Sequence, residues 1–517
     1  MPLGVQALLP FLALLVAAAV AHRRPRRPEN GWIAAGATTV AAVIALVELV
    51  RLAPGERVDV PYLTTFPYAD LAIRLDALSL SFATMTLATA ALLMLARLRM
   101  PGDRRDPWVS WLLTSVAVLA VIMAHNLLLV YIALQLLTLA WSGTLDEAAP
   151  RQRALRLAIQ VADLGLLLAA ASAIQSVGTS AFSGVPSDTF GAAAFLLALL
   201  PVLVRVAALA WPTRGSIAPV AFEPAVAWAA PAGYLMVRLV ALMGGRLPGR
   251  PLEAVIFGGA LLLGAAAAVR AFWERPGPRL VAFLLAAQAA VALALIASSS
   301  PLPLVASVWL WLQLIPLAGL CSVRLRRKSL AGAVALFALS MLPGSAAFIG
   351  LWIGGVGLIA NGFALALTPI GAVVLLAAVA ALSRIEKVDR IRVDVPTGWA
   401  VALVALAAVP LLLLGPVVIP AAQAVRPVPA GTVLMSPLGF TAGGTPWPAL
   451  LAAVLALGVL VALVRTDLGH LPRMPARFRL AMRYPAAPPR LSISPRWSTR
   501  ALWSAFIAVV ALAVLRP

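Results

Sequence analysis

A few ionisable side chains lie inside long apolar stretches, where a charge is costly. An ionisable group at the centre of a bilayer costs at least about 2.5 kcal/mol, so each one is a candidate for moving protons or ions. Asp163 and Arg205 stand inside such stretches, and Glu223 follows the turn at Pro219. We expect antiparallel helices to bring Arg205 and Glu223 together, because a buried pair costs less than two isolated charges. Since arginine rarely releases its proton, Arg205 would bias a proton path rather than carry protons.

Two aspartates admit both a structural and a functional interpretation. Asp163 has Arg156 seven residues before it on the same predicted helix, so it is either half of an ion pair or a proton-path residue. Asp76 lies at the start of another apolar stretch, two residues after Arg74. We expect Asp76 to cap that helix or to form a salt bridge with Arg74.

The remaining polar candidates are neutral or titrate weakly. Gln135 and Gln288 are amides in the middle of apolar stretches, where they can bridge helices or hold water but cannot be ionised. His125 lies at a turn between two stretches, where it can titrate, and we expect that turn to be solvated. One cysteine and three scattered histidines provide no ligand set for an iron–sulfur cluster or a haem. We therefore expect no cofactor, no metal and no catalytic residue.

The composition identifies the elements that position these residues as membrane helices. The 517 residues are 62% hydrophobic and only 11% charged, and the mean hydropathy is +0.99. Apolar stretches of about 18 to 25 residues recur, and each can cross a hydrocarbon core as a helix. The chain is thus predicted to be an all-α polytopic membrane protein with about sixteen spans: 5–21, 32–52, 73–96, 108–124, 127–143, 155–176, 190–210, 220–244, 252–272, 280–297, 302–323, 330–358, 363–382, 399–424, 449–464 and 501–515.

The charge distribution predicts the orientation of these spans. The net charge of +21 comes mainly from arginines clustered between alternate spans, which indicates cytoplasmic loops rather than nucleic-acid binding. We therefore expect a multi-pass protein of the bacterial cytoplasmic (inner) membrane with its N-terminus outside. Residues 53–70 are predicted to form an external hairpin, and 465–500 a basic cytoplasmic arm. Proline and glycine predict helix breaks near 212–231 and at 341–345.

Several segments, in order, resemble the antiporter-like membrane subunits of complex I, hydrogenase-4-type complexes, multisubunit cation/proton antiporters and the Dab-type inorganic carbon pump. Each segment matches a short helix motif of that superfamily, and together they extend over residues 73–382. They are 75–79 (Leu-Asp-Ala-Leu-Ser), 125–135 (His-Asn-Leu-Leu-Leu-Val-Tyr-Ile-Ala-Leu-Gln), 160–163 (Gln-Val-Ala-Asp), 219–220 (Pro-Val), 233–238 (Gly-Tyr-Leu-Met-Val-Arg) and 279–288.

The resemblance implies an architecture. It implies about fourteen core transmembrane helices in two inverted repeats with broken helices, followed here by two C-terminal helices. The corresponding boundaries are residues 1–106 for N-terminal helices, 107–250 for the first antiporter-like repeat, 251–397 for the second, and 398–517 for C-terminal helices with the basic segment.

This chain departs from the superfamily at most of the charged positions. Asp76 and Asp163 match, but the fifth-span glutamate is Gln135. The seventh-span lysine falls near Val202, with Arg205 one helical turn later. Neutral residues occupy the later histidine and lysine positions, which align with Trp309, Gln313, Leu317 and Leu351.

The resemblance implies a proton- or cation-translocating subunit of a multi-subunit energy-coupling complex in which most path residues are replaced. The alternative is a non-conducting structural subunit that anchors catalytic partners. A stand-alone transporter of an organic solute is disfavoured. Expected partners are the lipid bilayer and other complex subunits, either antiporter-like or redox subunits or, as the compact length favours, a large soluble zinc-containing protein. The chain would be at most a membrane subunit of an NADH:quinone oxidoreductase or hydrogenase-type complex.

Overall fold

The computed structural model describes most of the chain up to residue 447. The described residues are 3–25, 27–53, 55–63, 70–99, 107–142, 150–187, 190–210, 222–274, 277–322, 330–385, 395–412, 417–428, 433–436 and 439–447. The predicted spans 449–464 and 501–515 and the basic arm 465–500 lie outside them. Residues 1–469 belong to one compact unit.

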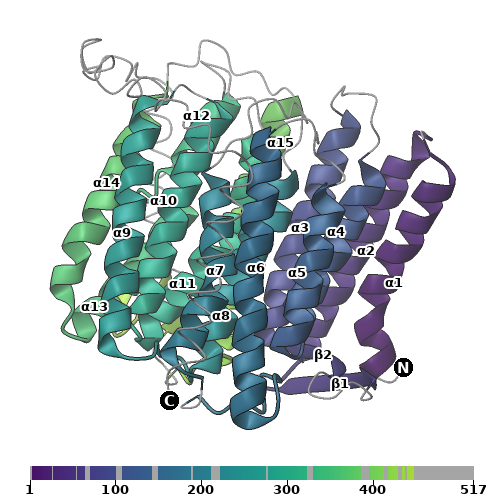
Figure 1. The fold of residues 1–517 in the computed structure, drawn as a ribbon. Helices are drawn as coiled ribbons and strands as arrows, with labels where there is room; N and C mark the ends of the chain where they lie inside the picture. The colour runs from purple at the N-terminus through teal and green to yellow at the C-terminus, as the bar shows by residue number, and fades with distance from the viewer. Residues whose placement is uncertain are drawn as a thin grey trace. The chain divides into compact units, whose positions relative to one another are not determined.

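The unit is a bundle of roughly parallel and antiparallel helices with a hairpin at one end (Figure 1). Its first half comprises α1 (Leu3–Arg23), α2 (Glu29–Arg51), β1 (Arg57–Leu63), β2 (Leu71–Asp76), α3 (Ala77–Arg99), α4 (Trp108–Met123), α5 (Leu127–Ser142), α6 (Pro150–Val177) and α7 (Ala192–Leu209).

The second half continues with helices and ends in a small sheet. Its elements are η1 (Glu223–Ala229), α8 (Ala230–Leu242), α9 (Arg250–Trp273), α10 (Pro278–Ala297), α11 (Pro301–Ala318), η2 (Gly319–Ser322), α12 (Leu330–Leu339), α13 (Ala346–Ala360), η3 (Ala364–Ala366), α14 (Leu367–Leu382), α15 (Val395–Leu412), α16 (Ile419–Gln423), β3 (Val433–Ser436), β4 (Gly439–Ala442) and β5 (Thr445–Trp447).

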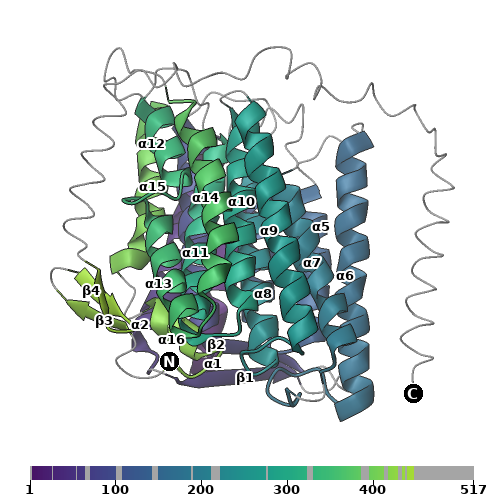
Figure 2. The same cartoon turned by 90° about the vertical axis from the view of Figure 1, so that its left-hand side faces the viewer.

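The predicted fold class is confirmed. Within the described residues, ten helical segments are long and apolar enough to cross a membrane, and four shorter apolar helices accompany them. The most apolar stretches of α8, α10 and α11 are 94% buried, so the core lies around these three helices. By contrast, Leu262 on α9 is 75% exposed, as expected for a side chain that faces lipid. Figures 1 and 2 place α9 and α14 at one side of the bundle and α1 and α2 at the other.

The hairpin predicted near residues 53–70 is present and extends into the next predicted span. Strands β1 and β2 pair antiparallel, with Asp59 opposite Arg74, so residues 73–76 are strand and not the first turn of a helix. The turn between α4 and α5 is fastened to β2, since the Asn126 side chain donates to the Asp70 carbonyl at 2.7 Å. The same side chain accepts from Leu129 N–H and caps α5.

The predicted break at 341–345 separates α12 from α13. Met341 has a φ of 57°, which is unusual for a residue with a side chain. A neighbouring helix satisfies a carbonyl group that the break exposes at the end of α12, since the Gln288 amide on α10 donates to Leu339 O at 3.2 Å. On the other side of the break, the Trp309 indole on α11 donates to Ala346 O at the start of α13, at 2.9 Å.

The predicted span 399–424 corresponds to α15 and the short helix α16, and residues 413–416 lie outside the described residues. The antiparallel sheet β3–β4–β5 was not predicted. A long apolar stretch is the signal that located the membrane helices, and these short strands do not have one.

Candidate functional site

The pair in the middle of the bundle joins Asp163 on α6 to Arg205 on α7. Arg205 Nη1 lies 2.6 Å from Asp163 Oδ1 and Nη2 lies 3.1 Å from Oδ2, which is the bidentate geometry of a strong ion pair. The two residues are 0% and 1% exposed. Arg205 Nη1 also donates to Pro201 O at 3.2 Å, whereas Nε has no hydrogen-bond partner among the described residues.

Close packing of the two helices makes this pair possible. A Cβ atom at Gly165 would lie only 2.4 Å from Leu197 O, so α6 and α7 approach each other where glycine leaves room.

The expected Arg205–Glu223 pair is wrong, because Arg205 pairs with Asp163 on α6. The expected Arg156–Asp163 pair is also wrong: seven residues span about 10 Å along a helix, and α7 offers a cation at the same level.

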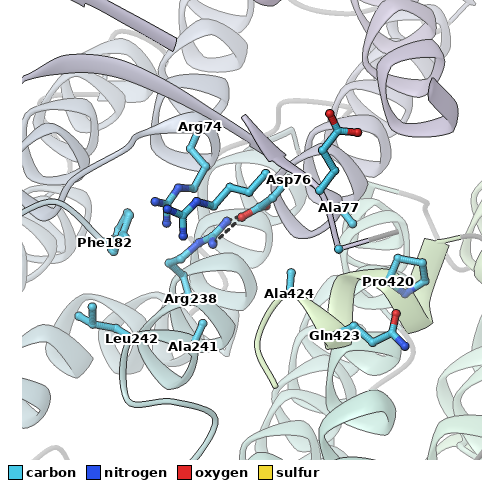
Figure 3. A pocket seen from close by; sticks show the side chains of 13 residues that line it. Arg74, Asp76, Ala77, Phe182, Arg238, Ala241, Leu242, Pro420, Gln423 and Ala424 are labelled. Carbon is cyan, nitrogen blue, oxygen red and sulfur yellow. Dashed lines mark hydrogen bonds and ion pairs between the residues drawn. The ribbon is translucent and has the colours of Figure 1, made fainter. Parts of the chain in front are cut away.

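A second buried pair lies where the hairpin enters the bundle. Arg238 on α8 contacts both carboxylate oxygens of Asp76, at 2.7 and 2.9 Å (Figure 3). Its Nε also donates to the Tyr234 hydroxyl at 3.0 Å. Ser79 N–H donates to Asp76 Oδ1 at 2.8 Å. The expected cap is thus confirmed, while the expected Asp76–Arg74 salt bridge is wrong. Arg74 instead meets its opposite residue in the hairpin, Asp59.

Asp59 is the centre of a small charged cluster on the hairpin. Arg74 donates to both of its oxygens at 2.8 and 3.2 Å, and Arg57 Nε lies 3.2 Å from Oδ2. Partial burial opposes ionisation of Asp59, but Arg74 and the other nearby cations outweigh it and hold its pKa below the usual value.

His125 joins this cluster and is buried, which corrects the expected solvated turn. Its Nδ1 lies 3.1 Å from Asp59 Oδ1. Burial lowers the pKa of His125, and the positive charge of Arg74 lowers it further against the opposing effect of Asp59.

The mid-span amides of the second half lie in the core and are only partly hydrogen-bonded. Gln288 is 1% exposed and uses its NH₂ group on Leu339 O, but its Oε1 has no partner among the described residues. Both polar atoms of Gln313, which is fully buried, are equally unpartnered there. Gln135 on α5 is half-buried, and its Nε2 also has no hydrogen-bond partner among the described residues. Such atoms call for internal water.

Sequence reasoning did not select Arg238 or Asp59 as site residues. Arg238 is a single charge within the apolar segment 224–245, so the cost of a charge in lipid was a sufficient signal to find it. Asp59 gave no such signal, because it lies in a mixed-charge segment and gains its partners only through strand register. Glu223 begins η1 and is half-buried.

Comparison with known proteins bears on the fold. No family model and no curated protein matches the chain. Among solved structures, a chain of the Mrp complex from Dietzia sp. DQ12-45-1b aligns with a TM-score of 0.71 and 17% identity, covering 100% of this chain and 60% of that one. This chain therefore spans less than two thirds of that relative.

Two respiratory complexes give similar alignments. A chain of the membrane-bound sulfane sulfur reductase, an archaeal respiratory membrane complex, has a TM-score of 0.69 and 16% identity, covering 99% of this chain and 95% of that chain. A chain of respiratory complex I from Thermus thermophilus has a TM-score of 0.60 and 17% identity, with coverage of 82% and 100%. At these identities the likeness establishes the fold: this chain has the fold of chains in the Mrp complex, the sulfane sulfur reductase and respiratory complex I.

Proposed function

We propose that this chain is an antiporter-like subunit of a multi-subunit energy-coupling membrane complex, and that its part in proton or cation movement depends on the Asp163–Arg205 pair. The observation that carries the proposal is this bidentate, fully buried pair, which joins the middle of α6 to the last turns of α7. A charge pair in that position is expensive to maintain in lipid, so a role in charge movement is the default interpretation.

The chemistry of the pair assigns different tasks to its two members. Asp163 can accept a proton and become neutral, whereas Arg205 keeps its charge throughout. Protonation of Asp163 would release the guanidinium group, and deprotonation would recapture it. Arg205 would thus control the charge state of the path without carrying a proton. Gln135, Gln288 and Gln313 can bind water along such a path but cannot store a proton.

Ion flux through the reconstituted complex tests this role. Asp163→Asn and Arg205→Ala should each reduce the coupled flux strongly, because each removes one half of the pair. Arg156→Gln is the matched control, since it removes a charge from the same helix without touching the pair. Flux that is unchanged in both pair variants, in a complex of normal subunit content, would contradict the proposal.

A second candidate function is a non-conducting structural subunit that anchors and orients catalytic partners. The neutral amides Gln135 and Gln313, at positions where the resemblance implies charged residues, favour it. This function requires assembly to depend on the chain. A complex purified from a deletion strain that kept its other subunits and its membrane attachment would exclude the structural role.

The remaining expectations are part of the same proposal. They are two inverted repeats at residues 107–250 and 251–397, a location in the bacterial inner membrane with the N-terminus outside, and a partner that is either a redox or antiporter-like subunit or a large zinc protein. Reporter fusions at the N-terminus test the orientation. Mass spectrometry of the copurified complex identifies the partner and hence the reaction coupled to it.

A further inference from the structure

A polar cavity of about 290 Å³ lies where the hairpin meets the ends of α8 and α16 (Figure 3). It has room for several waters or one small ligand, since a water molecule takes about 30 Å³. Three arginines line it: Arg57, Arg74 and Arg238. Its wall also contains the ring of Phe182, whose centroid lies 5.6 Å from the Arg74 guanidinium carbon and 5.7 Å from that of Arg238. These cation–π contacts help to fix the two cationic planes.

The two buried or partly buried carboxylates beside the cavity are occupied by arginine. Asp76 binds Arg238 through both oxygens. Asp59, which adjoins the cavity-lining arginines, accepts both of the Arg74 hydrogen bonds. Glu56 is exposed at the rim, and its Oε2 accepts the Ala53 N–H at 2.9 Å. Asp76 and Asp59 therefore direct their oxygen atoms to protein partners rather than to a ligand.

The arginines keep unused donors. Arg74 is only 3% exposed, yet it engages Asp59 through Nε and Nη2 alone, and its Nη1 group has no protein partner in the described part of the chain. Arg57, whose side chain is 48% exposed at the rim, has its Nε 3.2 Å from Asp59 Oδ2. A ligand in the cavity thus meets guanidinium N–H donors. A ligand group that only accepts hydrogen bonds, such as an anionic oxygen, is suited to them.

We propose that this cavity binds a small oxyanion, with a phosphate or carboxylate group held by Arg57 and Arg74. Arg238 and Asp76 support the wall and do not bind the ligand directly. The three arginines are balanced by Asp59, Asp76 and Glu56, so the site accepts one anionic group, binds it weakly, and loses it as ionic strength rises. The site does not depend on ion transport by the chain, because its contacts lie in the hairpin and not at the Asp163–Arg205 pair.

Thermal unfolding of the full chain in phosphatidylcholine nanodiscs tests the site, with inorganic phosphate as the probe and chloride at equal ionic strength as the reference. Phosphate should raise the unfolding temperature saturably. Arg57→Gln should weaken the apparent affinity roughly tenfold, as loss of a charge-assisted contact does. Arg51→Gln is the matched control, because Arg51 is an exposed arginine at the end of α2 that does not line the cavity. Equal affinity in the two variants would overturn the assignment.

A second arm identifies the source of the oxyanion. If a lipid headgroup occupies the site, nanodiscs that contain phosphatidylglycerol should stabilise the protein and abolish the response to phosphate, and Arg57→Gln should lose that stabilisation. If a soluble anion occupies it, the phosphate response should be the same in both lipids. Absence of stabilisation by both phosphate and phosphatidylglycerol would refute the site.

Discussion

The two halves of the Asp163–Arg205 pair should not be equivalent when one is removed. In Asp163→Asn the guanidinium stays at 1% exposure, keeps its hydrogen bond to Pro201 O, and cannot become neutral. Breaking a buried pair in this way costs about 3–5 kcal/mol. In Arg205→Gln the remaining carboxyl group can take up a proton, which leaves a neutral buried polar group that costs about 1–3 kcal/mol.

The double variant distinguishes the pair from its separate charges. Asp163→Asn combined with Arg205→Gln leaves two neutral amides in contact, so no uncompensated charge stays buried. We therefore expect the double variant to be the closest of the three to the natural protein in stability.

The assay is thermal unfolding in nanodiscs, followed by loss of monodisperse protein. The expected order of stability is natural protein, double variant, Arg205→Gln and Asp163→Asn. Equal losses in the two single variants, or a double variant as unstable as Asp163→Asn, would refute the reasoning. Such a result would mean that each charge has compensation independent of the other.

Two further predictions concern packing and pH. Gly233→Ala should destabilise the bundle by about 1–3 kcal/mol in thermal unfolding, since its Cβ would lie 2.9 Å from the Trp311 ring, whereas Gly258→Ala on α9 meets nothing within 4 Å and should be neutral or stabilising. Equal effects would contradict this packing. The pKa of His125 is lowered in the folded state, so acidification below its ordinary value of 6.5 should loosen the hairpin as the native state resists protonation. Because the pKa of Asp59 is also lowered, a second loss should follow below 3.8. Hydrogen exchange in β1 and β2, corrected for intrinsic rates, measures both, and protection that does not change with pH would argue against them.

Hydropathy located most membrane helices to within a few residues. The predicted stretch 108–124 is α4, which ends at Met123, and 280–297 corresponds to α10, which begins at Pro278. The break at 341–345 was also predictable, because proline and glycine act on the backbone locally. The free energy of transferring a segment from water to lipid is a sum over its residues, so these features can be predicted from consecutive residues of the chain.

The partners of the charged residues could not be read in this way. Arg205 was expected to meet an acid on the following helix and instead meets Asp163, on the helix before it. His125 was assigned to a solvated turn, but the hairpin covers it and adds Asp59 as a neighbour. Residue spacing in the sequence predicts neither outcome. Both depend on which helices and strands are adjacent in space and on how far along each element the charged residue lies.

The sequence by itself determined that this protein lies in a membrane, which residues form its membrane helices, and that these helices contain few titratable groups. The tertiary structure decided which of those groups are paired. It joins Arg205 to Asp163 and Arg238 to Asp76 in the interior, and it forms a cavity lined by arginine beside the hairpin. The physical reason is that transfer into lipid is a property of a segment, whereas an ion pair forms only when two distant segments bring opposite charges within a few ångströms.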